Sequence, residues 1–210
     1  SPDNIVAWWT GPLAGTVAPT TSKYAVFAKS PLTGFFGFGI SSGGFAYELK
    51  SAGWDGVVFL GRSPKPVYFF VDDDAYGLRD ASGIWGKTTW ETEELVKEEL
   101  GDDAVRVAAI GPAGESMVRI ADITNDRNRQ VGRTGLCSVI GSKMLKAVAA
   151  RGTGSVDVAD PDGLFQFSME LNERCKGPKT EKYRIYGTPV NVLVHQKLCC
   201  LPSYNFQRGT

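Results

Sequence analysis

The stretch KYAVFAKSPLTGFFGFGISSGGFAYELKSAG, residues 23–53, contains three structural signals in a row. Residues 23–30 predict a strand, and the Pro-Leu-Thr-Gly that follows predicts a turn. Residues 35–45 alternate aromatic residues with glycines, which predicts a strand or bulge whose backbone something approaches closely. Residues 44–53 predict a short helix that Gly53 ends as its C-cap.

Short apolar runs between glycine and proline turns continue on both sides of this stretch. We expect further strands at 4–11, 55–63, 65–74, 104–110 and 117–124. One amphipathic helix is expected at 89–101, with Trp90, Leu95, Val96 and Leu100 on its apolar flank. Residues 135–151 predict either one helix or a short helix followed by a strand from about residue 146.

The character of the chain changes after residue 153, where helical periodicity replaces strand patterns. Helices are predicted at 162–177 and 188–199, with Asp162 and Thr188 as N-caps. Because strands dominate early and helices late, we predict an α+β fold. Its β-rich domain would span 1–153, and 154–210 would begin a helical domain.

The composition narrows the class of function. Lys+Arg and Asp+Glu both total 23 in 210 residues, and this balance argues against a nucleic-acid binder, which usually carries a basic excess. No apolar run is long enough to span a membrane. The four cysteines form no CxxC pair, which favours a reducing, cytoplasmic setting over a disulfide framework.

The run TNDRNRQVGRTGL, residues 124–136, is the strongest candidate for chemistry. The guanidinium groups of Arg127, Arg129 and Arg133 suit phosphate or carboxylate, and Gly132 and Gly135 let backbone amides approach an anion. A helix starting near Gly135 would add its dipole. The alternative is a solvated turn in which Asp126 pairs with an arginine, and the spacing alone leaves both interpretations open.

The other motifs are weaker evidence for a functional site. Gly39, Ser41, Ser42, Gly43 and Gly44 could form an amide-lined cradle or only a glycine-rich bulge, and their spacing is not that of a dinucleotide fingerprint. His195 is the sole histidine, so no Ser/His/Asp set and no metal site built from protein ligands is predicted. VDDD (71–74) is most simply a turn at the end of a strand. No catalytic set is expected in this chain.

Several motifs, taken together, resemble the N-terminal domain of the aldehyde:ferredoxin oxidoreductases. The resemblance rests on residues 10–71, DASGIWGK (80–87), AAIGPAGE (108–115), NDRNRQVGRTGLCSVIGSKMLKAV (125–148) and LPSYNFQ (201–207). It implies a tungsten (or molybdenum) bis-molybdopterin cofactor lying on a β-rich base, with helical domains closing over it. The ligands of the family's 4Fe–4S cluster would follow Thr210, so we expect this chain to be part of a longer protein.

The resemblance also implies which residues contact the pterins. Lys23 stands where the family has a phosphate-binding arginine, and Ile40, Ser41, Ser42 and Gly43 stand where it has NSGG. Arg129 matches a pterin-contacting arginine, Gln130 replaces a small residue beside it, and Arg133 and Gly135 match a GRGG run that here is GRTG.

The whole protein would then oxidise an aldehyde to a carboxylic acid and pass electrons to ferredoxin or another iron–sulfur carrier. The alternatives are a related enzyme of the benzoyl-CoA reductase type, or a non-catalytic shortened homologue with a structural role. The expected partners are the remaining domains of the same enzyme, in a homo-oligomer or a larger complex, with neither nucleic acid nor a membrane span.

Overall fold

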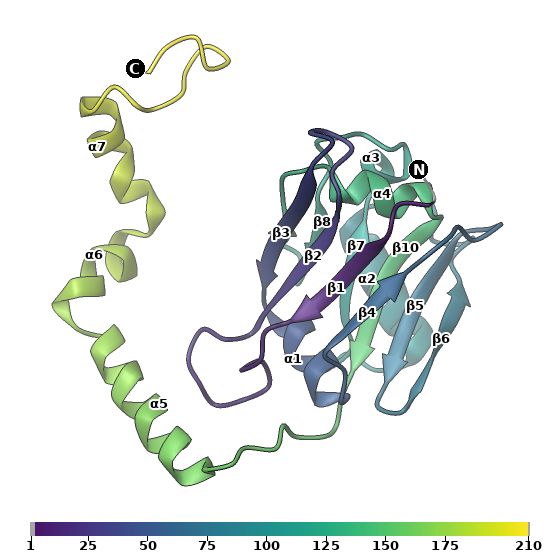
Figure 1. Cartoon of the computed structure of the whole chain (residues 1–210), viewed down its shortest axis with the longest axis horizontal. Helices are drawn as coiled ribbons and strands as arrows, with labels where there is room; N and C mark the ends of the chain where they lie inside the picture. The colour runs from purple at the N-terminus through teal and green to yellow at the C-terminus, as the bar shows by residue number, and fades with distance from the viewer. Residues whose placement is uncertain (1–2, 210) are drawn as a thin grey trace. The chain divides into compact units, whose positions relative to one another are not determined.

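A computed structural model describes residues 3–209, so the predicted domain limits at residues 1 and 210 lie outside it. The contacts divide the chain into two compact units, one up to Val158 and one from Ala159 onward. The first unit holds two β-sheets and four helices, which confirms the predicted α+β class (Figure 1).

The first sheet has four antiparallel strands in the order β3-β2-β1-β4. Its strands are β1 (Val6–Thr10), β2 (Lys23–Lys29), β3 (Phe36–Ser42) and β4 (Gly56–Phe59), and α1 (Gly44–Ser51) follows β3 directly. The glycine-rich stretch is therefore a regular strand, paired with β2 along its whole length, and the alternative of a bulge is wrong. Gly53 has a φ of 86° and follows the end of α1, as predicted.

The second sheet has six strands in the order β6-β5-β10-β7-β8-β9, and only the β5–β10 pair is parallel. These strands are β5 (Val67–Asp72), β6 (Ala75–Asp80), β7 (Arg106–Ile110), β8 (Ile123–Asn125), β9 (Arg129–Val131) and β10 (Leu145–Arg151). Three helices accompany them: α2 (Thr89–Leu100), α3 (Pro112–Glu115) and α4 (Leu136–Ser142).

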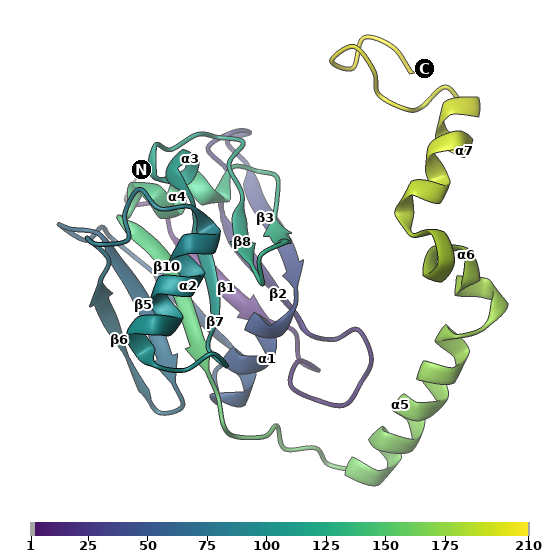
Figure 2. The ribbon, with the colours of Figure 1, turned by 180° about the vertical axis from the view of Figure 1, so that it is seen from behind.

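The two sheets and α2 form three layers. One apolar core fills the space between the sheets, from Val6, Trp8 and Val26 on one side to Val71 and Val148 on the other. A second, smaller core joins the opposite face of the six-stranded sheet to α2. The layers can be followed in Figures 1 and 2, where α2 lies behind the large sheet in one view and in front of it in the other.

Local signals explain where α2 begins. The Thr88 side chain accepts from the Glu91 amide while the Glu91 carboxylate accepts from the Thr88 amide, which is a capping box. Val96 is fully buried in the helix, but the prediction for Trp90 is wrong: it is 54% exposed and its Nε1 donates to the backbone oxygen of Arg127.

Several predicted elements need correction. The strand expected at 117–124 shortens to β8, because Met117 takes a φ of 59° and the residues before Asp122 form a turn. Residues 135–151 resolve into α4 and β10, which confirms the second of the two alternatives. The turn expected at 71–74 joins β5 to β6, a strand that the sequence analysis missed, as it missed β9 and α3.

The second unit is helical: α5 (Pro161–Cys175), α6 (Pro178–Tyr186), the 3-10 helix η1 (Thr188–Asn191) and α7 (Val192–Lys197). Asp160, two residues before the predicted Asp162, caps α5 by accepting from the Gly163 amide. Thr188 is not an N-cap, because it lies inside η1. His195 is exposed on α7, and α6 was not predicted. Within residues 3–209, no helix combines the length and apolarity that crossing a membrane requires.

Candidate functional site

The arginine stretch and the glycine-rich strand lie against each other. A Cβ added to Gly39 would lie 2.5 Å from Val131 Cγ1, and one added to Gly37 would lie 3.1 Å from Thr134 Cβ. At the other end, a Cβ on Gly43 would lie 2.0 Å from Asp126 Oδ2. Residues 126–134 therefore run along β3 in the opposite direction, and the predicted close approach to this strand is made by the chain itself.

A hollow of about 400 Å³ opens where β3 ends and α1 begins. It brings together four of the predicted site residues from three distant stretches: Lys23 on β2, Ser42 and Gly43 at the end of β3, and Arg129 on β9. We call this hollow the Lys23–Arg129 pocket. The rest of its lining is Gly15, Thr16, Ala18, Thr20, Thr21, Ser22 and Tyr47, so within the described residues no carboxylate faces it.

The two cations of the pocket are uncompensated. Among residues 3–209, neither the Lys23 ammonium nor the Arg129 guanidinium forms an ion pair or a side-chain hydrogen bond, and both residues are exposed. Two positive groups surrounded by hydroxyls and backbone amides, without an acid, form a site suited to an anion such as a phosphate.

The other arginines of the stretch differ from Arg129. Arg127 pairs with Glu94 at 2.8 Å and lies 5.8 Å from the Trp90 ring centre, so its charge is already engaged. Asp126 does pair with an arginine, as the surface-turn alternative predicted, and its partner is Arg106, whose Nε lies 3.9 Å from Asp126 Oδ1.

Arg133 and Gly135 lie at the far end of β3 from the pocket. Arg133 is exposed and Gly135 is buried. A Cβ added to Gly135 would lie 2.8 Å from the Arg119 carbonyl oxygen. A helix does begin there as predicted, but α4 has only seven residues and its first turn is buried. One small anion cannot contact both Arg129 and this turn, because β3 separates them.

The remaining predicted residues flank the pocket. Ile40 points out of the four-stranded sheet and is 53% exposed, opposite Ala25 on β2. Gln130 is exposed on β9, and Ser41 is buried beneath the pocket, where its hydroxyl donates to Asn125 Oδ1 at 2.7 Å.

Aromatic packing supports the pocket from below. Tyr24 is fully buried, stacks on Trp8 with ring centres 5.6 Å apart, and donates its hydroxyl proton to Asn125 Oδ1 at 2.9 Å. Burial raises the pKa of Tyr24, so this hydroxyl stays protonated and remains a donor.

Tyr47 and the hydroxyl residues of the β1–β2 loop also line the pocket but were not predicted as site residues. In this loop, Thr16, Thr20, Thr21 and Ser22 precede Lys23 closely. That concentration of hydroxyls was the available signal. Asn125 also had no predicted role, although it makes more side-chain hydrogen bonds here than its neighbours.

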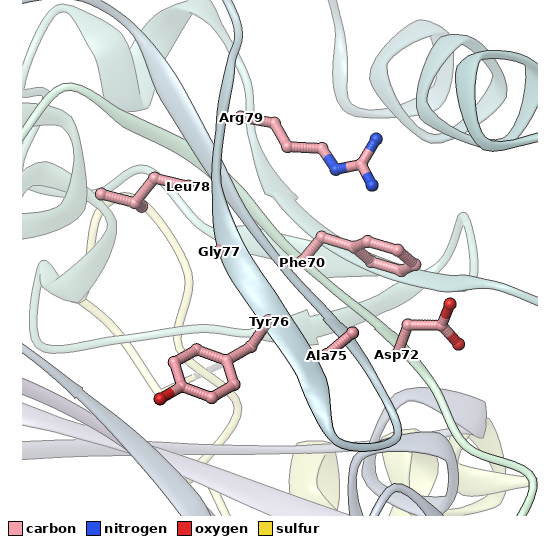
Figure 3. Close-up of a pocket in the computed structure, with 7 residues that line it drawn as sticks. All are labelled: Phe70, Asp72, Ala75, Tyr76, Gly77, Leu78 and Arg79. Carbon is pink, nitrogen blue, oxygen red and sulfur yellow. The ribbon is translucent and has the colours of Figure 1, made fainter.

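A second hollow, of about 220 Å³, lies on the β5–β6 hairpin (Figure 3). Arg79 and Phe70 extend on one side of the hairpin there, and Tyr76 and Leu78 on the other. The Arg79 guanidinium lies 5.1 Å from the Phe70 ring centre and 3.8 Å from Glu99, so its charge is compensated. This hollow therefore lacks the free cations of the Lys23–Arg129 pocket.

Comparison with known proteins agrees with this geometry. The family described as "Aldehyde ferredoxin oxidoreductase, N-terminal domain" matches residues 1–152, which include every residue of the pocket. The chain belongs to this aldehyde ferredoxin oxidoreductase family. The resemblance found in the sequence is thereby confirmed.

Relatives of this chain carry different enzyme names. The chain is 43% identical, over its whole length, to a tungsten-containing aldehyde ferredoxin oxidoreductase of Pyrococcus horikoshii, of which it covers 35%. It is 35% identical over 89% of its length to the WOR-like subunit of an aliphatic sulfonate oxidoreductase of Pyrococcus furiosus, of which it covers 31%. The chain thus spans about a third of the length of these relatives.

A solved structure with the same fold is the active-site complex BamBC of benzoyl coenzyme A reductase, in complex with 1,5-dienoyl-CoA. The TM-score is 0.81 at 39% identity, over 84% of this chain and 27% of that one. The relatives named as tungsten-containing and this structural neighbour together support membership of an oxidoreductase family.

Proposed function

We propose that this chain supplies the pterin-binding base of a tungsten bis-molybdopterin oxidoreductase, and that the Lys23–Arg129 pocket binds a phosphate of the cofactor. The observation that carries the proposal is the pair of uncompensated cations, Lys23 and Arg129, which two distant stretches bring to one pocket in a domain of this family.

The residues present fit a pterin phosphate. Lys23 contributes a point charge and Arg129 a planar guanidinium group with several donors. Both can form charge-assisted hydrogen bonds to a doubly charged phosphate. Gly43 supports this arrangement: its φ of 115° and ψ of −164° suit glycine alone, and a Cβ there would meet Asp126. The exposed residues Ile40, Gln130 and Arg133 are proposed to contact other parts of this large ligand. Ser41 and Gly135 are buried, and they are proposed to support the site from within the fold.

The redox chemistry belongs to the metal and its dithiolenes when they are bound, and this chain's residues hold and orient the group. Within the described residues, no three His, Cys, Asp or Glu side chains gather as metal ligands. We therefore propose that the ligands of an iron–sulfur cluster come from outside this chain. In this proposal residues 1–153 form the pterin-binding base, and 154–210 begin a helical domain.

For the whole protein we propose oxidation of an aldehyde to a carboxylic acid in the cytoplasm, with ferredoxin or a similar carrier as electron acceptor. The support is the 43% identity to a relative named for that activity. A reaction of the benzoyl-CoA reductase type is the second candidate, favoured by the TM-score of 0.81. Because relatives with differently named substrates share this domain, the pocket residues bind what these enzymes have in common.

The test is the tungsten and pterin content of the full-length protein and of three variants, Lys23→Met, Arg129→Ala and the control Lys29→Met. Lys23→Met removes a pocket cation, whereas Lys29→Met removes an exposed lysine at the other end of the same strand. We expect Lys23→Met and Arg129→Ala to lower cofactor content, since a charge-assisted hydrogen bond contributes about 1.5–3 kcal/mol, and Lys29→Met to leave it unchanged. A full-length protein without metal or pterin would support the non-catalytic alternative and refute the proposal.

A further inference from the structure

The two sides of the Lys23–Arg129 pocket belong to different sheets. Ser42 ends β3 in the four-stranded sheet and Gly43 follows it, whereas Arg129 begins β9 in the six-stranded sheet. The described backbone shows no strand pairing between β3 and β9. The distance between the two sides therefore depends on side chains that bridge the sheets.

Asn125, the last residue of β8, makes that bridge. It is 1% exposed, and its Oδ1 accepts from Tyr24 and Ser41 on the four-stranded sheet at 2.9 and 2.7 Å. Its Nδ2 donates to the Ser42 carbonyl and to Asp126 Oδ2, both at 2.9 Å. These four bonds use both donors and both lone pairs of the amide, so its orientation is fully determined.

Asp126 extends the bridge into the turn that carries Arg129. Its Oδ2 also accepts from the Gly44 amide at 2.7 Å, so the carboxylate occupies the first turn of α1. Its backbone oxygen accepts from the Asn128 amide at 2.7 Å, which closes the β8–β9 turn, and its φ is 44°. A shift of the Asn125 amide would therefore move the end of β3 and this turn relative to each other.

We propose that Asn125 is a positioning residue: its side-chain amide sets the place of the Arg129 guanidinium relative to the Ser42–Gly43 backbone. The inference rests on the proposed function, in that the group held between them is a phosphate of the cofactor. Asn125 is not among the residues that line the pocket. Its effect on binding passes entirely through the two segments that it joins.

A double-mutant cycle on pyrophosphate binding separates positioning from simple stability. Cofactor-free full-length protein is titrated with inorganic pyrophosphate by calorimetry, for the wild type, Asn125→Leu, Arg129→Ala and the double variant. Leucine keeps the volume and neutrality of asparagine but makes none of its four bonds. Because contacts acting through one another are non-additive, we expect Asn125→Leu to weaken binding about 10-fold alone and about 2-fold beside Arg129→Ala.

A milder pair of variants covers the case in which Asn125→Leu does not fold. Tyr24→Phe removes one donor to Asn125, and Tyr68→Phe removes the hydroxyl of another buried tyrosine, in the other core, that donates to Glu99 at 2.8 Å. We expect Tyr24→Phe to weaken pyrophosphate binding about 3-fold, in line with one lost hydrogen bond, and Tyr68→Phe to leave it unchanged.

The outcomes distinguish the two proposals. If Arg129→Ala leaves pyrophosphate affinity unchanged, the phosphate site is wrong and the positioning role falls with it. If Arg129→Ala weakens binding but Tyr24→Phe matches Tyr68→Phe, or Asn125→Leu costs the same factor in both backgrounds, the site stands and the positioning role is overturned.

Discussion

Replacing Thr134 by glycine is expected to stabilise the protein. Arg133, Thr134 and Gly135 have φ values of 71°, 56° and 73°, so three consecutive residues are left-handed. Among these three, Thr134 is the β-branched residue, whose side chain is the least suited to this conformation. Its Oγ1 is also buried without a hydrogen-bond partner among the described residues.

The magnitude follows from opposing contributions. A left-handed conformation costs a non-glycine residue about 1–2 kcal/mol, and an unpaired buried hydroxyl costs about 1 kcal/mol more. Two contributions oppose this gain. Glycine destabilises the folded state by about 0.5–1 kcal/mol because the unfolded chain becomes more flexible, and the lost methyl group costs about 0.8 kcal/mol. The net gain for Thr134→Gly is about 1 kcal/mol, or about 2–4 °C in the midpoint of thermal unfolding.

Urea and thermal unfolding of the chain measure this gain, and Thr134→Val separates its sources. Valine keeps the shape and the backbone cost but removes the unpaired hydroxyl, so it should recover only the hydroxyl contribution. The hydrogen bond from Ser30 Oγ to the Thr134 carbonyl, 2.6 Å long, remains in both variants. A Thr134→Gly variant no more stable than the wild type would refute the argument from backbone strain.

Two further predictions concern packing and pH. Gly39→Ala should cost about 1–3 kcal/mol in urea unfolding, because its Cβ would lie 2.5 Å from Val131 Cγ1; Gly77→Ala on β6 meets nothing within 4 Å and should be neutral. Burial raises the pKa of Cys137 from 9.0 to about 12, so the unfolded chain ionises first as pH rises above 9. Stability should then fall by about 1.4 kcal/mol per pH unit through this group between pH 9 and 12. Urea unfolding of Cys137→Ala over that range should show a correspondingly smaller pH dependence, and an equal slope in both proteins would contradict this.

Much of the fold was predictable from local pattern. The strand, turn and helix at 23–53, the capped α2, and the α4–β10 alternative all rest on signals within about ten residues of one another. The failures share a physical cause. β6 and β9 are edge strands, each paired with the strand before it in a hairpin, and most of their residues are exposed, so neither carries a buried apolar pattern. Met117, Val118 and Ile120 are apolar yet exposed, so hydrophobicity alone predicted a strand there.

The resemblance named candidate site residues, but the sequence did not predict how they are arranged. Lys23, Ser42, Gly43 and Arg129 were named from the resemblance, and the structure brings them to one pocket. Nothing in the sequence indicated that Arg127 would be paired with Glu94. That pairing depends on α2 and the β8–β9 turn meeting across 33 residues of chain.

The departures from the family pattern at residues 40–43 fall where a side chain has room. Ile40 projects from the outer face of the sheet, and Ser42 sits in a regular strand opposite Lys23, so neither position demands glycine. Gly43 is different, because its backbone geometry and the nearby Asp126 carboxylate exclude any Cβ, and here the glycine is kept. The sequence has therefore changed the side chains at the pocket's rim while retaining the backbone on which the proposed phosphate site depends.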